Sequence, residues 1–130
     1  MIVLDASAAL DWLLQTPDGE RIETRISWQG ESVHAPHLID LEIVHALRRL
    51  VRLGTVPPRR ADQAVLFLQA LPITRYPHTA LLNSVWRYRH SLTAYDAAYV
   101  VLAETLGATL LTRDARLAAA HGHVADIEVF

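Results

Sequence analysis

The chain has 130 residues, of which 52% are hydrophobic, and its formal net charge is −2. We therefore expect one domain, residues 1–130, with a proper hydrophobic core, and the absence of cysteine excludes disulfides and thiolate zinc sites. All 12 basic residues are arginine, which excludes a phosphate-binding P-loop and any lysine Schiff base.

The first half of the chain alternates between short apolar runs and amphipathic segments. The predicted elements, in order, are a strand over 2–4, a helix over 8–14, a break at 17–19, a helix over 20–28, a weak strand over 32–34 and a helix from Pro36 to about Leu53. The long helix is predicted because apolar side chains recur along it every three or four residues. Glu42 falls on that apolar stripe, where a lone charge is costly without a partner.

The second half continues the alternation. Its predicted elements are a helix over 59–71, a short strand over 73–74, a helix over 77–90, a helix over 94–106, a strand over 109–111, a short helix over 115–120 and an edge strand over 127–130. Thr93 is suited to cap the helix over 94–106 and Gly107 to stop it, and the nearly continuous apolar run between them predicts a helix buried on most sides. Strands that alternate with helices predict an α/β fold with a mostly parallel sheet and helices on both faces.

Four acids stand where this layout brings them to one cleft. Asp5 and Asp114 follow predicted strands, Asp96 lies in the first turn of the buried helix, and Glu42 lies on the apolar stripe. Ligands of parallel sheets bind outside the carboxyl ends of the strands. Clustered carboxylates repel one another unless a divalent cation lies among them, and oxygen-only ligands suit Mg²⁺, with Mn²⁺ as the alternative.

Each acid also has a simpler interpretation. Asp5 and Asp114 are suited to cap the helices that follow them, Asp96 to be only a first-turn acid, and Glu42 to pair with an arginine. Two hydroxyl residues, Ser7 and Thr112, are placed either to hydrogen-bond the acids or to form caps and turns. Four arginines are candidate contacts for phosphate groups or else solvated side chains: Arg87, Arg89, Arg113 and Arg116.

No segment has the features of a signal peptide or of a membrane span. The start of the chain has no basic region ahead of its short apolar run, and no apolar stretch of about 18 residues is free of charge. We therefore expect a soluble cytoplasmic protein that does not associate with membranes. The tryptophans, Trp12, Trp28 and Trp86, are expected in the core or in dimer contacts.

The chain resembles the PIN-domain ribonucleases, and specifically the VapC toxins of type II toxin–antitoxin pairs. The matching blocks are IVLDAS at 2–7, Glu42, TAYDAAY at 93–99 and LTRD at 111–114. They follow one another in the family's order along the whole chain, and the third block is the most specific. His45 is a departure, because many members carry Asn at this place after the Glu.

This resemblance implies a fold, an activity and partners. It implies a five-stranded parallel sheet and a Mg²⁺-dependent endoribonuclease whose metal ligands are Asp5, Glu42, Asp96 and Asp114. It also implies a homodimer that cleaves RNA and is inhibited by a cognate VapB-type antitoxin. The alternative is a catalytically inert PIN-like module that binds RNA or protein.

Two phosphotransfer classes also place Asp at strand ends. Receiver domains use a later lysine, which this chain lacks. Haloacid-dehalogenase phosphatases require a second Asp two residues after the nucleophile, where this chain has Ser7.

Overall fold

A computed structural model describes residues 1–130 and contains one five-stranded sheet. The strands are β1 (Ile2–Leu4), β2 (Val33–Pro36), β3 (Ile73–Tyr76), β4 (Thr109–Thr112) and β5 (Ile127–Val129). The helices are α1 (Ala6–Leu14), α2 (Pro17–Gln29), α3 (Leu38–Arg52), α4 (Pro58–Ala70), α5 (Leu82–Arg87), α6 (Ala94–Leu106) and α7 (Ala115–Ala119), with a 3₁₀ turn η1 (Thr79–Leu81).

The sheet has the order β3-β2-β1-β4-β5, and every neighbouring pair of strands is parallel. The predicted α/β fold with a five-stranded sheet is thus confirmed, and the sheet is wholly rather than mostly parallel. β1 lies at its centre, with Leu4 paired to Leu111 of β4. Ile2, Val3 and Leu4 are all fully buried. Successive strand residues point to opposite faces, so helices cover both faces of the sheet.

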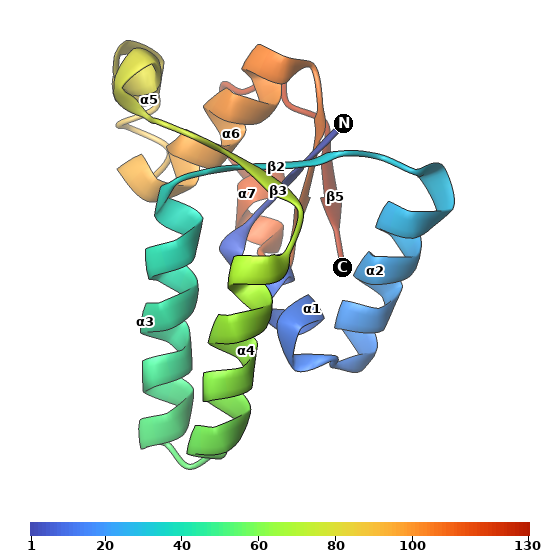
Figure 1. Cartoon of the computed structure of the whole chain (residues 1–130). Coiled ribbons are helices and arrows are strands. Elements are labelled where there is room, and N and C mark those ends of the chain that lie inside the picture. Colours follow the sequence, from blue (N-terminus) through green and yellow to red (C-terminus); the bar gives the residue numbers. More distant parts are fainter.

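The helices form two groups around this sheet (Figure 1). α6 packs against β1, β2 and β4, while α1 contacts α2, α3, α4 and β4. α3 and α4 form a long antiparallel hairpin that extends beyond the sheet, with their connecting turn at its far end (Figure 1). No helix has the length and hydropathy that a membrane span requires.

The buried helix α6 forms as its sequence predicts. The Thr93 hydroxyl accepts a hydrogen bond from the Asp96 N–H at 3.1 Å, and Gly107 ends the helix with φ +59°. Residues 97–103 are all buried. The cap therefore fixes the first turn of α6, which carries Asp96, at the edge of the core.

Two of the three corrections to the predicted boundaries concern prolines. The break predicted at 17–19 is wrong, because Pro17 occupies the first turn of α2 and Thr16 caps that turn by accepting from the Gly19 N–H. The helix predicted to start at Pro36 starts instead at Leu38, since Pro36 is the last residue of β2.

The third correction concerns residues 77–90. A single helix was predicted there, but the structure has the 3₁₀ turn η1 and the short helix α5. Two side chains of its predicted apolar face, Leu82 and Trp86, are 51% and 68% exposed. Trp28 is also exposed, at 86%, so Trp28 and Trp86 do not belong to the core.

Candidate active site

Asp5 is the buried acid at the centre of the site. It follows β1, its side chain is nearly inaccessible, and its backbone N–H donates to the Leu111 carbonyl oxygen at 3.0 Å. Its Oδ2 accepts hydrogen bonds from Ser7 Oγ at 2.6 Å and from Thr112 Oγ1 at 2.7 Å. Although Asp5 occupies the cap position of α1, its side chain makes no capping hydrogen bond. The carboxylate is therefore oriented by two hydroxyls and keeps Oδ1 unbonded.

The same two hydroxyls tie the end of β1 to the loop after β4. Ser7 Oγ accepts from the Arg113 N–H and Thr112 Oγ1 accepts from the Asp114 N–H, both at 3.0 Å. The loop that carries Asp114 is thus held by the same two side chains, Ser7 and Thr112, that orient Asp5. The two strand ends form one hydrogen-bonded unit.

Glu42 lies on α3 and is paired with a tyrosine rather than with an arginine. The Tyr99 hydroxyl donates to Glu42 Oε2 at 2.5 Å, and Tyr99 is 1% exposed. Burial raises the pKa of Glu42, the Tyr99 hydrogen bond opposes that rise, and the charges of Asp5 and Asp96 add to it. Burial and the Glu42 carboxylate both raise the pKa of Tyr99, so this hydroxyl remains a donor.

Tyr99 is a site residue that sequence reasoning missed. Its signal is its spacing, because it follows Asp96 by three residues and therefore lies on the same face of α6. The sequence offers an arginine as one possible partner for Glu42, and the buried Tyr99 hydroxyl is the partner in the structure.

Asp96 is coupled to its neighbours by charge. Burial raises the pKa of Asp96, and the carboxylates of Asp5 and Asp114 raise it further. Glu42 likewise responds to Asp5 and Asp96. Asp5, Glu42 and Asp96 thus influence one another's charge at the carboxyl-end edge of the sheet, and Asp114 joins them through Asp96.

Asp114 differs from the other three acids because an arginine neutralises it. Its Oδ1 accepts from the Arg116 N–H at 2.9 Å, which caps α7. The Arg116 guanidinium contacts both carboxylate oxygens, with Nε 2.9 Å from Oδ1 and Nη2 2.6 Å from Oδ2. These hydrogen bonds hold the pKa of Asp114 below its ordinary value, whereas the pKa values of Glu42 and Asp96 are raised.

The four carboxylates are chemically suited to bind a hard divalent cation, but their side chains are not spaced as metal ligands in this structure. Carboxylate oxygens are the ligands that Mg²⁺ prefers, and Asp5 Oδ1 and Glu42 Oε1 accept no hydrogen bond from the protein. However, no three His, Asp or Glu side chains stand together in an arrangement that holds a metal ion. Carboxylates at ligand spacing repel one another, which favours an open arrangement of these side chains.

Two of the candidate RNA-contacting arginines are on or just after α5. Arg87 donates to Ser84 Oγ at 2.9 Å, and the Arg89 guanidinium lies over the Trp86 ring, 5.0 Å from its centroid. Neither side chain contacts any of the four acids.

The other two arginines flank Asp114. Arg113 pairs with Asp11 at 2.7 Å and Asp18 at 2.5 Å and donates to the Phe130 carbonyl oxygen at 2.7 Å. Those three acceptors favour an internal role that ties the start of α2 and the chain end to the site. Arg116 is 89% exposed and contacts only Asp114.

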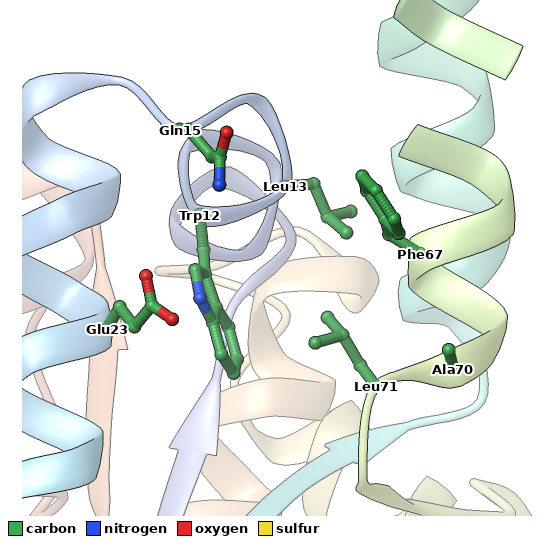
Figure 2. A pocket seen from close by; sticks show the side chains of 7 residues that line it. All are labelled: Trp12, Leu13, Gln15, Glu23, Phe67, Ala70 and Leu71. Atoms are coloured by element: carbon green, nitrogen blue, oxygen red, sulfur yellow. The ribbon is translucent and has the colours of Figure 1, made fainter. Parts of the chain in front are cut away.

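An apolar pocket lies away from the acids, between α1, α2 and α4. Figure 2 shows Trp12 and Leu13 of α1 facing Phe67 and Leu71 on the α4 side, with the Glu23 carboxylate beside Trp12. None of the four acids lines this pocket. It is a surface separate from the candidate catalytic edge.

Comparison with protein families gives one match over most of the chain. The family described as "PIN domain" matches residues 2–122. Ribonuclease VapC12 of Mycobacterium tuberculosis is 41% identical over 129 residues, covering 99% of this chain and 98% of its own. Ribonuclease VapC9 of the same species is 48% identical over 120 residues, covering 90% and 88%.

Solved structures agree on the fold. A crystal structure of a Pyrobaculum aerophilum protein superposes with a TM-score of 0.68 at 26% identity, covering 98% of this chain and 83% of its own. VapBC2 from Rickettsia felis, bound to a DNA fragment from its promoter, also gives a TM-score of 0.68, at 12% identity, covering 99% and 98%. The second likeness is one of fold alone.

Proposed function

Because the chain belongs to the PIN-domain family and, within it, to the VapC ribonuclease toxins, we propose that it cleaves RNA by Mg²⁺-dependent hydrolysis at the edge that carries the four acids. The observation that carries this proposal is the coupling of Asp5, Glu42, Asp96 and Asp114 across four chain segments. Two of these acids, Glu42 and Asp96, have raised pKa values and form no ion pair with an arginine, which is typical of carboxylates that take a cation.

We propose Asp5, Glu42, Asp96 and Asp114 as the residues that hold the ion, with Mn²⁺ as a substitute for Mg²⁺. A bound divalent ion supplies polarisation of the scissile phosphate and a water of lowered pKa. The protein contributes orientation: Ser7 and Thr112 fix the Asp5 carboxylate, and the Tyr99 hydroxyl fixes that of Glu42.

No histidine lies among the four acids or their hydrogen-bond partners, so the proposed hydrolysis uses no histidine base. Hydrolysis by water rather than by the RNA 2′-hydroxyl leaves 5′-phosphate and 3′-hydroxyl ends. In the structure the four acids do not form a ligand cluster, so all four would hold one ion only if their side chains lay closer together.

We further propose that the chain acts as a toxin in the cytoplasm, where RNA is, and that a cognate VapB-type antitoxin inhibits it. The names of the relatives, which are VapC ribonucleases, support this partner class. Two exposed apolar regions are available for protein contacts: the pocket of Figure 2, and Leu82 with Trp86 on α5. Such regions suit the contact surface of a homodimer.

The rival function is an inert PIN-like module that binds RNA or protein. Incubation of total RNA with the purified chain in Mg²⁺ and in EDTA separates the two. The proposal predicts cleavage only with Mg²⁺, with new 5′-phosphate ends on sequencing. Intact RNA under both conditions, with the protein folded, favours the rival.

A further inference from the structure

Arg116 and Asp114 form a forked ion pair at the edge of the candidate site. Both carboxylate oxygens of Asp114 are engaged, Oδ1 by the Arg116 N–H and Nε, and Oδ2 by Nη2 at 2.6 Å. No other acid of the site contacts an arginine. Asp114 is therefore the one proposed ligand whose oxygens are already taken by a cation.

The two partners differ in how firmly the fold holds them. Asp114 is fixed by its N–H bond to Thr112 Oγ1 and by capping α7. The Arg116 side chain is 89% exposed and forms no hydrogen bond or ion pair except with Asp114. An exposed, unpacked guanidinium can leave its partner by rotating into solvent. Arg113, held by three acceptors, cannot.

We propose that Arg116 exchanges partners during catalysis: it covers Asp114 until a divalent cation binds, and it then contacts a phosphate of the RNA. This inference rests on the proposed function and assigns a role to one residue within it. A carboxylate and a phosphate present similar pairs of oxygens to a planar guanidinium, so the same fork serves both partners. Arg116 thereby competes with the metal for Asp114. When the metal displaces it, Arg116 offers one positive charge to the RNA.

The first test is Mg²⁺ affinity, measured by titration calorimetry without RNA. Arg116→Ala removes the competitor, so Mg²⁺ should bind roughly two- to fivefold more tightly, the range expected for loss of an exposed ion pair. Arg116→Lys, which keeps the charge but loses the fork, should give a smaller gain. Arg59→Ala is the matched control, because Arg59 is exposed on the first turn of α4 and forms no ion pair; it should change nothing.

Removing any positive charge near the site also strengthens cation binding. Repeating the Arg116→Ala measurement in an Asp114→Asn protein separates this general effect from direct competition for Asp114. Asn caps a helix about as well as Asp, so Asp114→Asn should preserve α7. In that background Arg116→Ala should no longer tighten Mg²⁺ binding. A gain of equal size in both backgrounds, or no gain in either, overturns the exchange.

The second test is RNA binding in EDTA, where no cleavage occurs. Anisotropy of a fluorescein-labelled 12-nucleotide uridine RNA gives the slope of log affinity against log salt. Asp114→Asn frees Arg116, so this slope should steepen by about 0.7, the increment for one added phosphate contact on a single strand. Asp96→Asn removes an equal charge without freeing Arg116 and should leave the slope unchanged.

The double variant Asp114→Asn/Arg116→Ala should return to the wild-type slope. If it keeps the steeper slope, or if Asp96→Asn steepens the slope equally, Arg116 does not transfer to RNA and the inference fails. Its failure is distinct from failure of the proposed function: a wild type that cleaves RNA with Mg²⁺ but shows none of these shifts loses only the exchange. A wild type that neither binds Mg²⁺ nor cleaves RNA loses both.

Discussion

The Tyr99 hydroxyl donates a 2.5 Å hydrogen bond to Oε2 of Glu42 and so joins the buried helix α6 to α3. Removing it by Tyr99→Phe leaves a half-buried carboxylate without its only protein partner, at a cost of about 1–3 kcal/mol. We expect a folded protein with lower thermal stability and roughly tenfold weaker cleavage at limiting Mg²⁺.

The pH–rate profile tests the role of Tyr99 further. The Tyr99 hydrogen bond lowers the pKa of Glu42, so its loss should move the acid limb of the profile to higher pH. Tyr95→Phe is the control, since Tyr95 is 65% exposed and contacts none of the acids. An unmoved acid limb in Tyr99→Phe would show that Glu42 does not depend on this hydroxyl.

Asp96→Asn should separate stability from activity. The raised pKa of Asp96 means that its charged form is disfavoured in the fold, chiefly by burial and then by Asp5 and Asp114. The neutral isostere should therefore raise the melting temperature in EDTA while abolishing cleavage. A variant that melts lower in EDTA contradicts the charge repulsion inferred at this edge.

The pH dependence of stability follows from the same shifts. The pKa values of Glu42 and Asp96 are raised above their ordinary values of 4.5 and 3.8, so the fold favours their protonated forms. That stability is fully present below the ordinary values and is lost as pH rises through the raised ones. Asp114 acts oppositely, because its lowered pKa gives stability that is lost only as pH falls through the lowered value.

Thermal unfolding in EDTA, measured from pH 7 downward, checks the direction of this pH dependence. The difference in stability between the wild type and Glu42→Gln/Asp96→Asn should shrink as pH falls toward the ordinary carboxyl values. Saturating Mg²⁺ should stabilise the wild type more at pH 7 than near pH 5, because the ion requires deprotonated ligands. A stability gap that stays constant with pH would rule out these two groups as its source.

Gly19 tests the contact between α1 and α2. A Cβ at this position would lie 2.0 Å from the Asp11 carbonyl oxygen and 2.5 Å from its carbonyl carbon. Because backbone cannot yield as a side chain does, Gly19→Ala should cost about 3 kcal/mol or more in urea unfolding. Gly30→Ala, where the space is open but φ is +60°, should cost only about 1 kcal/mol. Equal costs would mean that α2 shifts to admit the methyl group.

The strand positions and the edge acids were predictable because their signals are local. Asp5 follows a three-residue apolar run and Asp96 follows a capping threonine, so their placement needs only the period of the sheet and the start of one helix. The parallel sheet then brings strand ends to one edge. The order of the strands and the closeness of Glu42 depend on packing between distant segments.

What the sequence did not reveal depends on tertiary partners. Arginine is the partner that the simpler interpretation gives Glu42, yet a buried tyrosine on another helix reaches it, and Asp114 is the acid that pairs with an arginine. Both partners lie three residues or fewer from a predicted ligand, and only the packing of the helices decides which pairs form. Pro17 and Pro36 were misread because proline suits a helix start and a strand end alike.

The central claim is that these four carboxylates hold the ion that cleaves RNA. Its most direct test compares wild type with folded Asp96→Asn on total RNA, in Mg²⁺ and in EDTA, with sequencing of the 5′ ends. We predict 5′-phosphate ends from the wild type in Mg²⁺ alone and none from the variant. Cleavage by the wild type in EDTA, or by folded Asp96→Asn at the wild-type rate in Mg²⁺, would contradict the claim.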